Sequence, residues 1–243
     1  MLHPELTKAT PFMLKTASQL RPSPPPNLRS RAYAHAWHEV KRLGERDSTH
    51  RTPDQTAAAV WWMEFSEGLV NRLTRRLVNE EQLELWRTAR LFALMNAALV
   101  DTYVAVWDSK YEFNHWRPYT AIRAASMDGN HSTRADSQWD SLRPAPPFPE
   151  YVSAHAAGCA CTLSLLGTEF GSRREITLDS LTAPPDMPTR SFESFKEAAR
   201  ECADSRIWLG FHFSYSTRAG TKLGRRSAQY ARTHYLRPIG SFK

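Results

Sequence analysis

The chain has 243 residues, of which 41% are apolar and 11% aromatic, so it is long and apolar enough for one large folded domain and is not disordered. It has no run of about 18 apolar residues and no secretory signal, so we expect a soluble protein, cytoplasmic by default, without a membrane span. The formal net charge is +7 and arginine supplies 25 of the 32 basic residues, which fits either a solvated surface or a site where planar guanidinium groups bind an oxyanion partner.

The N-terminal segment differs in composition from the rest. Residues 1–27 show no helical period and end in Arg-Pro-Ser-Pro-Pro-Pro, so we expect an extended, Pro-rich arm. Residues 28–243 are expected to form a single helical domain. Its first helix is predicted over 28–43, with Asn27 as N-cap and Gly44 as C-cap.

Two more helices are predicted in the first half of the domain. One begins near Asp54 and continues to Phe65. The other, over 79–107, has acidic residues at its start and an apolar stripe with three- and four-residue steps, made of Leu83, Trp86, Ala89, Ala93, Ala97, Val100, Val104 and Trp107. Further apolar residues lie off that stripe, so this helix is expected to be the central helix of the core.

The second half is predicted to alternate irregular and helical segments. Residues 128–151 are irregular, 153–170 are helical and 171–189 form a Pro- and Ser-rich loop. Two last helices are predicted over 191–213 and 218–236. No stretch alternates with period 2, so the predicted fold class is an all-α helical bundle.

The cysteine content gives a separate expectation. The chain has three cysteines, which is too few for a disulfide framework. Two of them, Cys159 and Cys161, do not have the spacing of zinc ligands. We therefore expect neither a disulfide framework nor a zinc site.

The first segment that carries chemistry is Lys110-Tyr-Glu-Phe-Asn-His-Trp-Arg117-Pro118. Its two cations are seven residues apart, which on a helix is about two turns, so both can point the same way. The competing interpretation is a pair of surface cations stabilised at a helix C-terminus.

The second segment has a rigid Pro-Phe-Pro approach to Ser153, Ala154 and His155 at the start of a helix. Backbone N–H groups at a helix start form a ready anion site, to which the Ser153 hydroxyl would add a donor. In the competing interpretation Ser153 is simply an N-cap.

The third segment contains Arg206 and His212, six residues apart. On a regular helix they would lie about 120° apart, so they face one pocket only from its two sides or if the helix breaks near Gly210. The alternative for His212 is a satisfied core histidine. Together the three segments offer the cations, imidazoles and hydroxyl that hold a tetrahedral or trigonal-bipyramidal oxyanion.

These motifs in this order resemble the acid phosphatase and vanadium haloperoxidase superfamily, which includes the type-2 phosphatidic acid phosphatases. The matching patterns are K-x6-R-P, Ser-x-His after Pro-Phe-Pro, and S-R-x5-H. The resemblance extends over about 94–228, and an upstream run over 40–55 is similar to the soluble bacterial haloperoxidase-like branch. Relatives of this type are usually longer, so a truncated or minimal member and a homo-oligomer both stay open.

The resemblance implies roles for individual residues and a vanadate cofactor, whose site phosphate can also occupy. His212 would bind vanadium or act as a phosphoryl-accepting nucleophile, and His155 would be the acid/base. The oxyanion would be held by Lys110, Arg117, Ser153, the N–H of Ala154, and Arg206. Trp107 and Phe148 would line the halide side, with core packing as the alternative.

The sequence departs from the family pattern at two positions. Ala154 stands where the pattern has Gly, and an alanine tolerates a positive φ less well. Ser216 stands where the pattern has an Asp that orients the nucleophilic histidine in the phosphatases. That loss weakens histidine nucleophilicity and so weighs modestly against a phosphatase, while a neutral imidazole still suffices as a metal ligand.

The resulting hypothesis is a vanadate-dependent haloperoxidase whose small-molecule partners are hydrogen peroxide, a halide and an organic acceptor. The main alternatives are a soluble acid phosphatase that cleaves phosphomonoesters through a phosphohistidine, and an inactive relative. Nucleic-acid binding is not expected, because the arginines are scattered and no known nucleic-acid motif is present.

Overall fold

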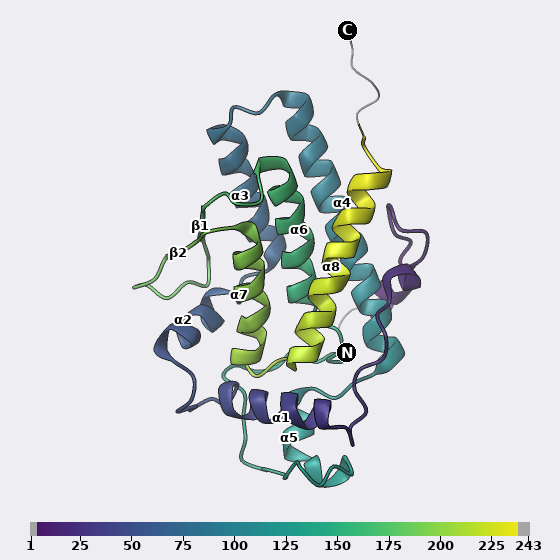
Figure 1. Ribbon diagram of the computed structural model, residues 1–243, viewed down its shortest axis with the longest axis vertical. Coiled ribbons are helices and arrows are strands. Elements are labelled where there is room, and N and C mark those ends of the chain that lie inside the picture. Colours follow the sequence, from purple (N-terminus) through teal and green to yellow (C-terminus); the bar gives the residue numbers. More distant parts are fainter. Residues whose placement is uncertain (1–3, 238–243) are drawn as a thin grey trace.

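The structure is a computed structural model that describes residues 4–237, and within them it is mostly helical (Figure 1). This confirms the predicted all-α class. In chain order the elements are η1 (Pro4–Lys8), η2 (Ala17–Leu20), α1 (Arg31–Leu43), α2 (Pro53–Trp61), α3 (Ser66–Glu80), α4 (Leu85–Phe113), α5 (Pro118–Arg123), η3 (Ala125–Met127), α6 (Ala154–Phe170), β1 (Ile176–Asp179), β2 (Thr189–Phe192), α7 (Phe195–Trp208) and α8 (Ser214–His234).

Helix α6 is the centre of the bundle and packs against α3, α4, α7 and α8 (Figure 1). Its neighbour α8 approaches very closely through two glycines one turn apart. A Cβ at Gly220 would lie 2.4 Å from the Ser153 carbonyl oxygen, and one at Gly224 would lie 2.1 Å from that of Ala157. Only glycine permits this separation. The N-terminal end of α6 is therefore fixed against the first half of α8.

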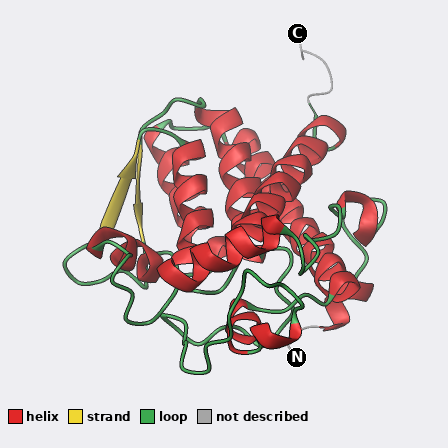
Figure 2. Cartoon of the chain, turned by 60° about the horizontal axis from the view of Figure 1, so that its bottom comes forward, coloured by secondary structure: helices red, strands yellow, loops and turns green. Residues whose placement is uncertain are grey.

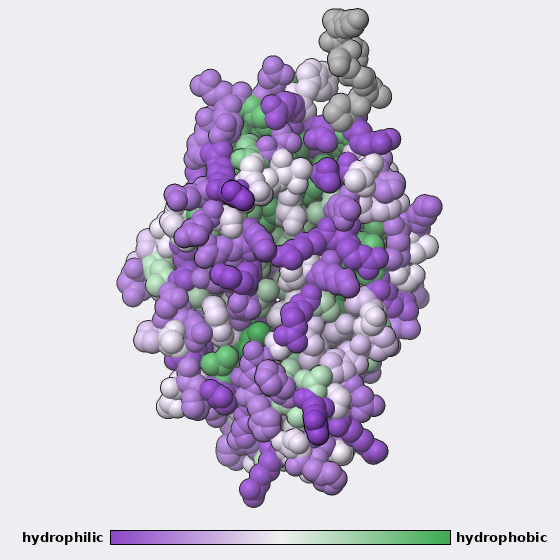
Figure 3. All heavy atoms as spheres, in the orientation of Figure 1, coloured by the Kyte–Doolittle hydropathy of each residue, from purple (hydrophilic) through white to green (hydrophobic). Residues whose placement is uncertain are grey.

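The helix predicted over 79–107 is present as α4, but α6 and not α4 is the centre of the bundle, and the predicted apolar stripe of α4 is only partly buried. The first part of the predicted stripe points outward: Trp86 is 83% exposed and Val100 is 41% exposed. The off-stripe residues Leu91, Leu94 and Leu99 are buried instead. The stripe enters the core only near its end, since Val104 and Trp107 are buried. The surface seen in Figure 3 is otherwise largely hydrophilic, with small apolar patches between polar side chains.

By length and composition alone, α4 also qualifies as a membrane span, contrary to the sequence expectation. The candidate stretch is Leu85–Arg123, with a mean hydropathy of 1.3. However, 56% of its apolar window is buried inside the protein. That degree of burial is typical of a core helix in a soluble protein.

The N-terminal segment packs along α4. Between its two short 3₁₀ helices, the backbone N–H groups of Phe12, Met13 and Leu14 donate to the Asp101 carboxylate over 2.6–2.7 Å. Asp101 is only 1% exposed, and these three charge-assisted hydrogen bonds satisfy it. The segment is thus anchored to the middle of the bundle.

Several element boundaries differ from the predictions. Helix α1 is capped by Ser30 and not by Asn27, although Gly44 is its C-cap as predicted. The helix expected from near Asp54 to Phe65 is α2, which already ends at Trp61, and the next helix, α3, was not predicted. The loop expected over 171–189 contains β1, which pairs antiparallel with β2 at the edge of the molecule (Figure 2).

One disulfide corrects the expectation drawn from the cysteine count. Cys159 on α6 is bonded to Cys202 on α7, which lies 43 positions later in the sequence, while Cys161 is free and buried. Helix packing brings the two together, so their spacing in the sequence gives no sign of the bond. The disulfide ties together the two helices that carry the second and third chemical segments.

Candidate functional site

The first segment is not one continuous helix. Helix α4 ends at Phe113 because Asn114 is left-handed, with φ 43°, and Arg117 lies beyond it at the start of α5. The prediction that Lys110 and Arg117 share a helix face is therefore wrong. Both cations nevertheless lie close to the Phe148 ring. Lys110 Nζ is 5.1 Å and Arg117 Cζ is 4.8 Å from the ring centroid.

Lys110 is held by the loop that precedes α6. Its ammonium is fully buried and donates to the carbonyl oxygens of Pro149 at 2.8 Å and Glu150 at 2.9 Å. Burial, and next the nearby positive charge of Arg117, lower the pKa of Lys110 well below its ordinary value. A bound anion would favour its charged form.

The second segment forms the start of α6. Ser153 is the N-cap, and its Oγ accepts from the N–H of Ala156 at 3.4 Å. Ala154 opens the helix and is not among the positive-φ residues, so the Gly-to-Ala difference introduces no left-handed strain there. The His155 Nε2 is buried and has no hydrogen-bond partner in the part of the chain that the structure describes.

The third segment breaks at Gly210, as the sequence allowed. Gly210 has φ 76°, and the N–H groups of Phe211 and His212 turn back to the Arg206 carbonyl oxygen at 3.0 and 3.2 Å. The Arg206 side chain donates to Ser205 Oγ at 3.0 Å and to the carbonyl oxygen of Trp62 at 2.7 Å. The break brings Arg206 and His212 to the same end of the bundle.

His212 joins the first and third segments. Arg117 Nη1 lies 3.1 Å from His212 Nε2 and also donates to the Phe211 carbonyl oxygen at 3.0 Å. On the other side of the ring, Nδ1 lies 2.8 Å from Glu150 Oε1. Glu150 was not singled out from the sequence; the only available signal was a lone acidic residue in an apolar, Pro-rich run. Among the described residues, Oγ of Ser216, the residue that departs from the family pattern, makes no close hydrogen bond, although this hydroxyl helps to lower the pKa of Glu150.

Burial and charge set the protonation of the two histidines. The pKa of His212 lies well below its ordinary value, first because of burial and then because of the neighbouring cations. Burial, followed by the charge of Arg206, has the same effect on the pKa of His155. Burial raises the pKa of Glu150 to about 7, although Lys110 and Arg117 oppose this shift. Both imidazoles are therefore neutral near pH 7.

The three cations are buried together with a single carboxylate. Exposure is 0% for Lys110, 8% for Arg117 and 5% for Arg206, while Glu150 is 0% exposed. Burial lowers the pKa of Arg117 to about 10 and that of Arg206 to about 9, so both stay protonated at neutral pH. With every group ionised, the excess is two positive charges, which matches a doubly charged anion.

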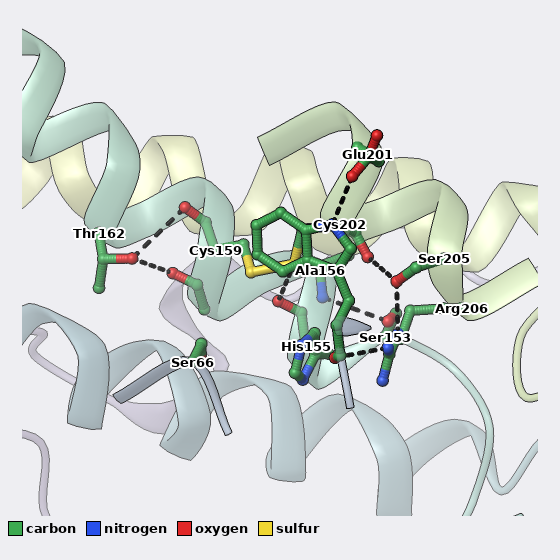
Figure 4. Close-up of a disulfide and its surroundings, with 12 residues drawn as sticks. Ser66, Ser153, His155, Ala156, Cys159, Thr162, Glu201, Cys202, Ser205 and Arg206 are labelled. Carbon is green, nitrogen blue, oxygen red and sulfur yellow. Dashed lines mark hydrogen bonds between the residues drawn. A yellow bond between two sulfur atoms is a disulfide. The ribbon is translucent and has the colours of Figure 1, made fainter. Parts of the chain in front are cut away.

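Unpartnered donors at this end of the bundle also fit an anionic ligand. Within residues 4–237, Arg117 Nη2 is buried and makes no hydrogen bond, and the buried Ser216 Oγ makes no close one although it interacts with the Glu150 carboxyl. Figure 4 shows Ser153, His155 and Arg206 side by side next to the Cys159–Cys202 disulfide. Vanadate or phosphate offers the acceptor oxygens that such donors need.

The two aromatic residues expected on the halide side contact one another. The rings of Trp107 and Phe148 are 5.3 Å apart, and Trp107 is 8% exposed. Because Lys110 and Arg117 lie over the same Phe148 ring, these aromatics form one wall of the cationic cluster. All nine residues predicted for the site are thus brought to one end of the bundle, and their roles stay predictions.

Comparison with known proteins identifies relatives with the same architecture. A family model described as the VCPO second helical-bundle domain matches residues 90–241. The chain is 28% identical over 264 residues to a vanadium chloroperoxidase from Curvularia inaequalis, covering 80% of this chain and 43% of that protein. The chain therefore spans less than half the length of this curated relative.

Solved structures agree with this result. A bacterial vanadium-dependent iodoperoxidase has a TM-score of 0.81 at 27% identity, covering 95% of this chain and 57% of the other. A holo-type bacterial vanadium-dependent chloroperoxidase has a TM-score of 0.75 at 19% identity, covering 94% and 53%. The second likeness, at that identity, concerns the fold alone.

Proposed function

The chain belongs to the family of the VCPO second helical-bundle domain, and from that premise we propose that it is a vanadate-dependent, haloperoxidase-like enzyme that oxidises halide with hydrogen peroxide. The observation that carries the proposal is a neutral His212 beside three buried cations, Lys110, Arg117 and Arg206, with one compensating carboxylate. Such a site favours a compact dianion over a larger or neutral ligand.

Each residue has a distinct task in this proposal. The three cations hold the vanadate oxygens, assisted by the Ser153 hydroxyl and the N–H of Ala154. His212 offers its Nε2 lone pair as the ligand to vanadium. Bound vanadate supplies the oxidising centre at which hydrogen peroxide is activated toward halide.

The remaining residues handle protons and the halide. His155 is neutral with an unpaired Nε2, so it can take a proton from peroxide and return it. Trp107 and Phe148 present an aromatic wall to the halide, and an organic acceptor takes up the oxidised halogen. We place this activity in the cytoplasm. No nucleic acid takes part in it, and the enzyme is either a monomer or a homo-oligomer.

The test is halide oxidation after loading with orthovanadate. Purified protein is assayed for triiodide formation from iodide and peroxide, and for bromination of an organic acceptor. We expect activity that depends on both vanadate and peroxide and that is abolished in His212→Ala. Activity that is equal with and without vanadate, or unchanged in His212→Ala, would refute the proposal.

A second function, phosphomonoester hydrolysis, is favoured by one specific observation. The sequence argued against it because Ser216 lacks the negative charge that orients the nucleophile, yet Glu150 places a carboxylate 2.8 Å from His212 Nδ1. In this reading His212 Nε2 takes up the phosphoryl group. Two results together identify the phosphatase. A small aryl phosphate as substrate leaves a phosphohistidine that an alkaline quench traps, and vanadate inhibits the enzyme without conferring peroxidase activity.

A further inference from the structure

Glu150 is a buried carboxylate fixed on several sides. It lies in the irregular loop before α6 and is 0% exposed. Its backbone N–H donates to the His115 carbonyl oxygen at 3.0 Å, and its own carbonyl oxygen accepts from Lys110 at 2.9 Å. The backbone of Glu150 is therefore tied to two residues of the first segment, which fixes the direction of its side chain.

The carboxylate connects to the third segment through one oxygen. Oε1 accepts from the backbone N–H of Phe213 at 3.0 Å and lies 2.8 Å from His212 Nδ1. A backbone N–H can only donate, so Oε1 is an acceptor in the first contact. A carboxylate oxygen has two lone pairs, so Oε1 can accept a second hydrogen from the imidazole.

The other ring nitrogen gives independent information about the tautomer. Arg117 Nη1 lies 3.1 Å from His212 Nε2, and a guanidinium has donors and no acceptor. Nε2 must therefore present a lone pair, which leaves the single proton of the neutral ring on Nδ1. Both contacts specify the same tautomer, one from each side of the ring.

From this geometry we propose that Glu150 is the positioning residue of His212, and that it holds the ring as the Nδ1–H tautomer with the Nε2 lone pair facing the cations. It would replace, from a different segment, the Asp that the family pattern places at position 216. The assignment gains its importance from the proposed function, in which Nε2 is the reactive nitrogen, but the tautomer itself does not depend on that function.

The direct test is NMR of the full chain labelled with ¹⁵N-histidine, at pH 8 and without vanadate. Protonated and unprotonated ring nitrogens give separate signals, and loss of signals in His212→Gln identifies this residue among the nine histidines. We expect protonated Nδ1 and unprotonated Nε2 in the wild type. In Glu150→Leu, which removes the acceptor, we expect a mixture of tautomers, whereas the exposed-site control Glu175→Leu should match the wild type.

Two results in this experiment overturn the proposal. The first is a protonated Nε2 in the wild type, which decides the matter even where Glu150→Leu does not fold. The second is an unchanged, pure Nδ1–H signal in a folded Glu150→Leu protein.

A binding measurement separates positioning from general structural support. Glu150→Gln keeps the shape and an acceptor oxygen but removes a negative charge beside the cations. We expect it to bind inorganic phosphate at pH 8 at least about threefold more tightly than the wild type, with the His212 tautomer retained. Weaker binding would mean that Glu150 only supports the fold, and would overturn the proposal. Neither readout involves vanadate or turnover, so both stay decisive if halide oxidation is not found.

Discussion

At the scale of single residues, the main feature of the site is that its charged side chains are buried away from water. Lys110, Arg117 and Arg206 are each nine-tenths or more buried, and among the described residues Glu150 is the carboxylate buried with them. An uncompensated buried charge destabilises a protein strongly unless a partner satisfies it. The contributions of these side chains are therefore best measured by anion binding.

Arg117→Ala should weaken the binding of inorganic phosphate by about 10- to 100-fold, because it removes charge-assisted hydrogen bonds worth roughly 1.5–3 kcal/mol. Isothermal titration at constant ionic strength measures the effect. Arg173→Ala is the matched control, since Arg173 is exposed and lies in the loop after α6. Equal affinities for the two variants would remove Arg117 from the anion site.

His115 makes stability depend on pH. Its Nε2 lies 2.6 Å from the Tyr215 hydroxyl, and burial lowers its pKa from 6.5 to about 4. The unfolded chain takes up this proton as the pH falls below 6.5, while the folded chain does not. The stability contribution is therefore complete above pH 6.5 and is lost progressively toward pH 4.

We expect the wild type to lose about 2 kcal/mol more unfolding free energy than His115→Gln between pH 7 and pH 5. The reason is that only the unfolded chain takes up the proton over the roughly 1.5 pH units between 6.5 and 5, at about 1.4 kcal/mol per unit. The glutamine keeps a hydrogen-bonding group near Tyr215 but does not titrate. Urea unfolding at both pH values gives the difference. Parallel loss of stability in both proteins would show that His115 titrates normally.

At the scale of elements, the turn between α7 and α8 determines where His212 lies relative to Arg206. Gly210 combines a φ of 76° with close contacts, because a Cβ there would lie 2.6 Å from the Gly44 carbonyl oxygen and 2.8 Å from the Ser141 side chain. Gly171 has a similarly unusual φ of 97°, but no atom of the described residues beyond its chain neighbours lies within 4 Å of a Cβ built there. Comparing the two glycines therefore separates the effect of backbone strain on stability from the effect of steric crowding.

Gly171→Ala should lower the unfolding free energy by about 1 kcal/mol, the usual effect of an alanine at positive φ. Gly210→Ala should lower it by about 3 kcal/mol or more, because the added methyl also displaces backbone. Denaturant unfolding measures both, and phosphate binding should fall only in Gly210→Ala. Equal destabilisation by the two variants would mean that the turn accommodates the methyl group.

The same elements show what the sequence can and cannot predict. The helix over 153–170 was predicted almost to the residue, because a Pro-rich approach leads into the Ser153 N-cap. Helix α3 was not predicted separately, since its N-cap Phe65 makes no side-chain capping hydrogen bond and so leaves no local signal. Glu150 and the disulfide were missed for another reason, because their partners lie 62 and 43 residues away.

At the scale of the whole molecule, the disulfide joins α6 to α7 across the bundle. A cross-link over 43 residues restricts the unfolded chain and stabilises the folded one by about 2–4 kcal/mol. The wild type should lose that amount in urea unfolding when dithiothreitol is added. The double variant Cys159→Ala, Cys202→Ala should be insensitive to the reductant, and an equal response in both proteins would mean that the bond does not form in solution.

The buried cations also make folding depend on the concentration of oxyanions in solution. The unfolded chain has no preformed anion site, so every increase in free phosphate or vanadate shifts the equilibrium toward the native state. A ligand present at 100 times its dissociation constant adds about 2.7 kcal/mol. The melting temperature should accordingly climb with the logarithm of oxyanion concentration and stay flat with chloride at equal ionic strength. Because of the excess positive charge in its interior, the folded fraction of this protein is expected to rise with the concentration of oxyanions around it.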